Sequence, residues 1–138
     1  MNDKVFIDTN VLVYAFATVK GSPDDRRIQF AHEILSRGGV ISVQVLNEFV
    51  QVCRQKARLE WDRVIEALQV IKELCEPAVP ITIETHEAAV AISRQYGFHI
   101  YDSLILAAAA QAGCEVAYSE DMQHGQMIGS VKIVNPFL

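Results

Sequence analysis

The chain has 138 residues, 51% of them hydrophobic and 21% charged, and its 12 basic and 17 acidic residues give a formal net charge of −5. This composition excludes a disordered or fibrous protein, and the length predicts a single domain over residues 1–138. The longest apolar runs fall well short of the roughly 20 residues that a membrane span needs, and the N-terminus does not resemble a signal segment, so we expect a cytoplasmic protein.

The acidic balance also argues against a broad basic surface that binds nucleic acid by counterion release. It does not exclude a nuclease, because metal ions bound to clustered carboxylates can supply positive charge where a phosphate lies. The cysteines Cys53, Cys75 and Cys114 are odd in number and widely spaced. We expect them to be reduced structural thiols rather than a disulfide framework or a zinc site.

The first half of the chain reads as short strands alternating with longer helices. Apolar spacing predicts, in chain order, a strand at residues 4–7, helices at 11–17 and 26–37, a short strand at 40–42, and helices at 43–57 and 61–75. Thr9 or Asn10 is expected to cap the first helix. The last two helices are expected to form a hairpin.

The second half continues the alternation. It predicts a brief strand or irregular segment at residues 81–83, a helix over 88–96 ended by Gly97, an alanine-rich helix over 103–112 opened by Asp102, and strands at 115–118 and 131–134. Short apolar strands separated by helices favour an α/β protein. We predict a three-layer α/β/α sandwich with a short parallel central sheet.

Four acids lie after the predicted strands or in the first turns of the predicted helices. Ligands bind at such positions in α/β folds. Asp8 follows the first strand, Glu48 lies one turn into a helix, Asp102 begins the alanine-rich helix and Asp121 follows the strand at 115–118. In open parallel sheets, ligands bind beyond the carboxyl ends of the strands. Each acid alone could be a helix-start, turn or solvated residue, but together they are expected to meet at one edge.

Four carboxylates cannot stay ionised together without compensation. Two unit charges about 5 Å apart repel by roughly 3 kcal/mol at an effective dielectric near 20. Oxygen ligands without histidine or cysteine suit Mg²⁺ or Mn²⁺, so the pattern favours a shared metal site. The four histidines show no pairing for metal-free ribonuclease chemistry, and His32, His86 and His99 are expected to be structural or surface residues.

The motifs that carry these acids resemble those of a known family. They are FIDTNVLVYA at residues 6–15, NEF at 47–49, YDSLILAAA at 101–109 and YSEDMQHG at 118–125. In this order they resemble the PIN-domain family, and most of all the VapC-type toxins of bacterial toxin-antitoxin pairs. The resemblance implies a PIN-like fold and an endoribonuclease that hydrolyses RNA phosphodiester bonds with metal-activated water, using Mg²⁺ or Mn²⁺.

The resemblance also implies roles for single residues. Asp8, Asp102 and Asp121 would face the metal, and Glu48 would complete the acidic quartet. Three further residues, Asn10, Ser119 and Thr9, match supporting positions, although each could simply cap a helix or stabilise a turn. Glu120 leaves open which acid of its turn leads. Arginine and lysine residues on the helices, including Lys56, are not assigned to RNA binding.

The implied partners are an RNA substrate, a protein antitoxin and a second copy of the chain in a homodimer. The helix pair between residues 43 and 75 is the expected groove for the antitoxin. The alternative is a PIN-like nuclease in RNA processing or DNA cleavage without an antitoxin. Phosphoryl transfer by an aspartyl enzyme fits less well, because that pattern wants a second acid where Asn10 stands. A binding module without catalysis is the third alternative.

Overall fold

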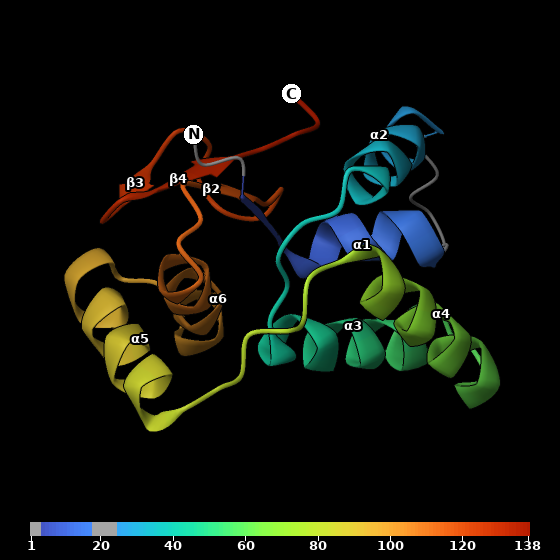
Figure 1. Ribbon diagram of the computed structural model, residues 1–138, viewed down its shortest axis with the longest axis horizontal. Coiled ribbons are helices and arrows are strands. Elements are labelled where there is room, and N and C mark those ends of the chain that lie inside the picture. The colour runs from blue at the N-terminus through green and yellow to red at the C-terminus, as the bar shows by residue number, and fades with distance from the viewer. Residues whose placement is uncertain (1–3, 18–24) are drawn as a thin grey trace.

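The computed structural model describes residues 4–17 and 25–138 (Figure 1). Within these residues the chain alternates between short strands and helices of two to four turns. The elements are β1 (Val5–Ile7), α1 (Thr9–Phe16), α2 (Asp25–Ser36), α3 (Val43–Gln55), α4 (Trp61–Leu74), α5 (Ile83–Tyr96), α6 (Ile100–Gln111), β2 (Val116–Tyr118), β3 (Met127–Ile128) and β4 (Val131–Val134).

The strands form one small sheet in the order β1-β2-β4-β3. β1 pairs with β2 and β2 with β4 in parallel, as predicted, but β3 pairs with β4 antiparallel. The sheet is therefore mostly parallel, as expected, with one antiparallel edge strand that was not predicted. Only residues 129 and 130 separate β3 from β4, and a connection of two residues can join only antiparallel strands. The α/β/α class itself is confirmed.

Helices cover the sheet in two groups, which Figure 1 shows on the two sides of the molecule. α6 packs against β2 and β4, and α5 lies alongside α6. Residues 103–109 of α6 are all buried, and their alanines let this helix approach the sheet closely. On the other side α1 contacts α2 and α3, while α3 and α4 form the predicted hairpin.

One predicted strand is not formed, and the segment that was expected to be either a strand or an irregular segment is not a strand. Residues 40–42 make only isolated bridges, in which Val40 pairs with Phe6 and Ser42 with Val79. Residues 81–83 are not a strand, because Thr82 instead caps α5 by accepting a hydrogen bond from the amide of Thr85. Runs of three residues have too little pattern for apolar spacing to separate a strand from an extended connection.

The three cysteines are free and buried, as expected. Burial disfavours the thiolate and raises the pKa of Cys53, Cys75 and Cys114 to about 11. No helix within residues 4–17 and 25–138 has the length and apolar character needed to cross a bilayer.

Gly39 allows the chain to run close beside β1. The amide of Val40 donates to the carbonyl oxygen of Val5 at 2.9 Å, so the two segments are in direct contact. A Cβ atom on Gly39 would lie 2.6 Å from Cδ1 of Ile7 and 3.1 Å from the carbonyl oxygen of Val5. The missing side chain therefore permits this approach.

We expect Gly39→Ala to lower the free energy of unfolding by about 1–3 kcal/mol, because the added methyl group overpacks the site. Urea denaturation followed by circular dichroism measures this loss. Ile7→Val removes Cδ1, the nearest atom. The double variant should therefore lose less than the sum of the single losses, and strict additivity would contradict the predicted clash.

Candidate active site

The pairing of β1 with β2 places Asp8 beside Ser119. Ile7 is in register with Tyr118, so the next residue on each strand leaves the sheet at the same edge. The amide of Asp8 donates to the carbonyl oxygen of Tyr118 at 3.0 Å, which continues the ladder by one step. Two residues 111 positions apart in the sequence are thus held together by backbone hydrogen bonds.

Asp8 both caps a helix and faces a pocket. One carboxylate oxygen, Oδ1, accepts a hydrogen bond from the amide of Thr9 at 2.7 Å, so Asp8 is the N-cap of α1. The prediction that Thr9 or Asn10 caps this helix is therefore wrong, because the helix begins earlier than its apolar residues indicate. The other oxygen, Oδ2, accepts from the hydroxyl of Ser119 at 2.7 Å.

Asn10 joins the end of β1 to the turn after β2. Its Nδ2 donates to Oδ2 of Asp121 at 3.1 Å, and its Oδ1 accepts from the amide of Glu120 at 3.3 Å. The hydroxyl of Ser119, which is fully buried, also accepts from the amide of Asp121 at 3.3 Å. Asn10 and Ser119 therefore fix the positions of both Asp8 and Asp121.

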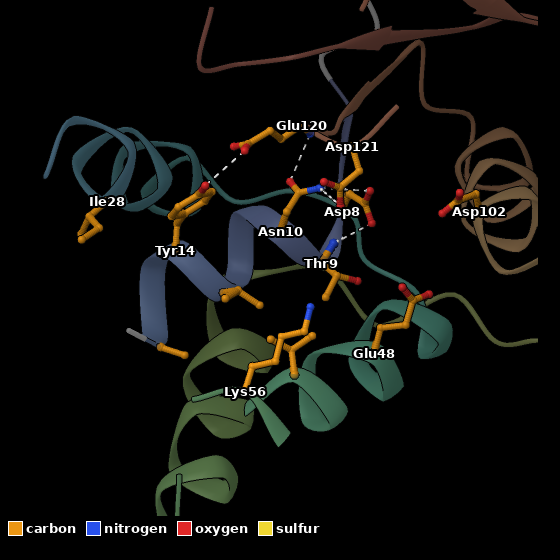
Figure 2. A pocket seen from close by; sticks show the side chains of 13 residues that line it. Asp8, Thr9, Asn10, Tyr14, Ile28, Glu48, Lys56, Asp102, Glu120 and Asp121 are labelled. Carbon is orange, nitrogen blue, oxygen red and sulfur yellow. Dashed lines mark hydrogen bonds between the residues drawn. The ribbon is translucent and has the colours of Figure 1, made fainter. Parts of the chain in front are cut away.

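The four predicted acids, Asp8, Glu48, Asp102 and Asp121, line a single cavity of about 270 Å³. Figure 2 shows Glu48 on α3 and Asp102 on α6 facing Asp8 and Asp121 across this space. We call this cavity the acid pocket. Thr9 and Asn10 also line it, whereas Ser119 lies behind Asp8. In the described part of the chain, no three acidic, histidine or cysteine side chains are already grouped closely enough to hold an ion.

Burial and mutual repulsion raise the pKa values of three of these acids. Burial raises the pKa of Asp8 from 3.8 to about 7, partly offset by the hydrogen bonds from Ser119 and Thr9. The pKa of Glu48 is raised by burial and by the charges of Asp102 and Asp121. Burial and the charge of Asp121 likewise raise the pKa of Asp102. Burial and the crowding of carboxylates therefore disfavour the ionised forms of these acids, which a bound cation would favour.

Glu120 lines the same cavity but points away from Asp8 and Asp121 (Figure 2). Its carboxylate accepts a hydrogen bond from the hydroxyl of Tyr14 at 3.1 Å and lies 3.7 Å from Nε of Arg27. The guanidinium of Arg27 is also 5.9 Å from the ring of Tyr14. Asp121 rather than Glu120 is therefore the acid of this turn that faces the other three.

Three residues in or near the acid pocket were not assigned to the site from the sequence. Gln44 donates from Nε2 to Oε2 of Glu48 at 3.0 Å, a contact that four-residue spacing on a helix could have indicated. His99 is exposed and caps α6 in place of Asp102, which is a structural role as expected, and its charge lowers the pKa of Glu48 and Asp102. Lys56 at the end of α3 extends its amine toward Thr9 (Figure 2).

The donor set fits a hard divalent cation. The acid pocket offers carboxylate oxygens from four separate elements, and the buried hydroxyl oxygen of Thr9 has no hydrogen-bond partner among the described residues. Histidine and cysteine are absent from its lining. Mg²⁺ and Mn²⁺ prefer such oxygen ligands and keep several waters, so they do not require a closed cage of side chains.

Comparison with known families decides which fold family this site belongs to. The profile of the PIN domain matches residues 5–127, a range that includes all four acids. The chain belongs to the PIN domain family. No curated protein sequence gives a match.

Two solved structures share the PIN fold. VapC20 from Mycobacterium tuberculosis, described as a sarcin-ricin loop cleaving toxin, has 18% sequence identity and a TM-score of 0.66, over 86% of this chain and 90% of that chain. A toxin-antitoxin complex from Klebsiella pneumoniae has 18% identity and a TM-score of 0.70, over 96% of this chain and 98% of that chain. At this identity the likeness shows the fold.

The raised pKa of Asp8 predicts how the stability of this PIN domain varies with pH. A carboxyl that binds protons more tightly in the folded state stabilises it below pH 3.8 and loses this contribution as the pH rises through about 7. In EDTA, thermal unfolding should therefore occur at lower temperature at pH 8 than at pH 5. Asp8→Asn, which keeps a capping oxygen, should reduce this slope and be the more stable protein at pH 8.

Asp62→Asn is the matched control, since Asp62 is an exposed acid in the first turn of α4. Its pH profile should follow that of the wild type. Parallel profiles for Asp8→Asn and wild type would show that burial does not raise the pKa of Asp8.

Asn10→Ala should lower the free energy of unfolding by about 1 kcal/mol, because it removes the hydrogen bonds that Asn10 makes to Asp121 and to the amide of Glu120. The amide of Glu120 should also exchange its hydrogen faster. Asn47→Ala is the control, because Asn47 is exposed on α3. Equal effects of the two substitutions would contradict the bridging role of Asn10.

Proposed function

We propose that this PIN domain is a metal-dependent endoribonuclease and the toxin of a type II toxin-antitoxin pair. The observation that carries the proposal is the convergence of four carboxylates from separate elements on one cavity at the carboxyl ends of β1 and β2. The two structural neighbours support the biological role, because one is described as an RNA-loop cleaving toxin and the other as part of a toxin-antitoxin complex.

Asp8, Asp102 and Asp121 are the proposed metal ligands, with Glu48 beside them. A bound Mg²⁺ or Mn²⁺ would supply an activated water for attack on phosphorus and would offset charge on the phosphate. The protein itself orients the ligands. Ser119 and Asn10 hold Asp8 and Asp121, while Gln44 holds Glu48. The amine of Lys56 provides a positive charge at the border of the pocket, where it attracts the RNA backbone.

Exposed apolar residues on α4 favour a protein partner. Trp61 is 54% exposed, and Ile65, which follows about one turn later on the same face of the helix, is 50% exposed. Clustered exposed apolar side chains are typical of interaction surfaces. We assign this face of the α3–α4 hairpin to a protein antitoxin or to a second copy in a homodimer, in the cytoplasm. The alternative function, a PIN nuclease without an antitoxin, predicts that no small antitoxin gene lies beside the gene for this protein.

Purified protein should cut single-stranded RNA in Mg²⁺ or Mn²⁺ and should not cut in EDTA. Asp8→Asn and Asp102→Asn should each reduce the cleavage rate by about 100-fold or more, because each removes one charged oxygen ligand. Gel electrophoresis of end-labelled RNA measures the rate. Cleavage of internal bonds distinguishes an endonuclease from an exonuclease.

Glu115→Gln is the control, since Glu115 is an exposed acid outside the acid pocket. It should cut at the wild-type rate. Undiminished cleavage by Asp8→Asn and Asp102→Asn, or full activity in EDTA, would overturn the proposed metal-dependent site. Cleavage of DNA in place of RNA would favour the alternative nuclease.

A further inference from the structure

A second cavity opens beside the acid pocket. It has a volume of about 470 Å³, within the range of small-molecule sites in proteins. We call it the amide groove, and its lining residues are Gln44, Asn47, Glu48, Gln51, Val52, Gln55, Lys56 and Tyr101. Glu48, Val52 and Lys56 line the acid pocket as well, so the two cavities are adjacent.

The floor of the amide groove is a row of side-chain amides on α3. Asn47, Gln51 and Gln55 are four residues apart, so they lie on one face of the helix and extend over about 12 Å. All three are exposed, and within the described ranges they have no hydrogen-bond partner. Gln44 differs because it is buried and donates to Glu48. The row therefore offers three unused amides directly outside the acid pocket.

Tyr101 completes the groove from α6. Its side chain is 54% exposed although it stands next to Asp102 in the sequence. An exposed aromatic ring beside a row of amides provides the two contacts that unpaired bases use. Bases of single-stranded RNA stack on aromatic side chains and form hydrogen bonds through their edges.

The charge of the groove also suits a nucleotide. Its amides are neutral, and each carries both hydrogen-bond donors and an acceptor, as base edges do. Among the described residues that line it, the only ionisable groups besides Tyr101 are Glu48 and Lys56, both at the border with the acid pocket. The acidic side chains of this protein repel phosphates, but the neutral amides on the floor of the groove do not.

The position of the groove suits an endonuclease, which must bind RNA on both sides of the bond that it cuts. RNA continues on both sides of the phosphate that is cut, so a neighbouring nucleotide must lie outside the acid pocket, and the amide groove is adjacent to that pocket. We propose that the amide groove binds the unpaired base next to the cut phosphate, with Tyr101 stacking on the base and Gln51, the middle amide of the row, reading its edge. This inference rests on the proposed ribonuclease function.

The test measures base preference rather than activity alone. A library of short single-stranded RNAs with randomised bases around the cut site is cleaved by wild type, Gln51→Ala, Tyr101→Ala and Tyr101→Phe, and the products are sequenced. Wild type should prefer certain bases at one position next to the cut. Gln51→Ala should change or relax this preference, and kcat/KM for the preferred sequence should fall by about tenfold.

Tyr101→Ala should also lower kcat/KM by about tenfold, because stacking is lost, whereas Tyr101→Phe should keep near wild-type values, because its ring still stacks. Gln69→Ala, an exposed amide on α4, is the control and should leave the preference unchanged. A merely structural role of Tyr101 would lower the unfolding temperature of Tyr101→Ala together with its kcat/KM, or would make Tyr101→Phe lose as much kcat/KM as Tyr101→Ala. Either result would overturn the proposal.

Two further outcomes are distinguishable. If wild type cuts no RNA in Mg²⁺ or Mn²⁺, the proposed function fails. If wild type cuts and Gln51→Ala and Tyr101→Ala keep its base preference and kcat/KM, the proposed function stands and the base site is refuted. A change in sedimentation of these variants with unchanged preference would likewise refute the base site, because the groove would then belong to a contact between copies.

Discussion

Three parallel residue pairs join β1 to β2 and end with Ile7 opposite Tyr118. Because the residues that follow must leave the sheet together, this register places the carboxylate of Asp8 within 2.7 Å of the Ser119 hydroxyl. A shift of one strand by one residue would turn its side chain to the opposite face and separate the pair. The acid pocket therefore depends on a very short piece of sheet, which the buried helix α6 supports from one side.

The acids of the pocket are held by neutral donors rather than by cations. Asp8 accepts from Ser119 and from the Thr9 amide, Asp121 accepts from Asn10, and Glu48 accepts from Gln44. Neutral donors orient a carboxylate without cancelling its charge. Glu120, in contrast, lies beside Arg27. Arg27 thus pairs with the acid that points away from Asp8 and Asp121, whereas Asp8, Asp121 and Glu48 are held by neutral donors.

The order of most helices and strands could be predicted from the sequence. So could the convergence of the four acids at one edge of the sheet. Both follow from strong local signals, namely helical periodicity in α3 and α4, and an acid directly after β1 and near the end of β2. Prediction from the sequence failed for β3, which has two residues, and for the helix caps at Asp8 and His99. Such features depend on tertiary contacts that a short segment does not encode by itself.

The sequence also could not separate the basic residues by role. Arg27, Arg54 and Lys56 all read as polar residues on helices. Arg54 lies 4.6 Å from the ring centre of Trp61 and donates to the carbonyl of Leu59, and Arg27 lies beside Glu120. Only Lys56 of these three lines the acid pocket. The roles of these basic residues depend on distances between helices. The spacing of residues along one helix gives no information about such distances.

The buried thiols have a practical consequence. With pKa values of about 11, Cys53, Cys75 and Cys114 remain protonated at neutral pH, and their burial keeps alkylating reagents away. A single cysteine introduced at an exposed position such as Gln95 would be the one readily modified thiol of the chain. A fluorescent maleimide could then be attached there without first replacing the native cysteines.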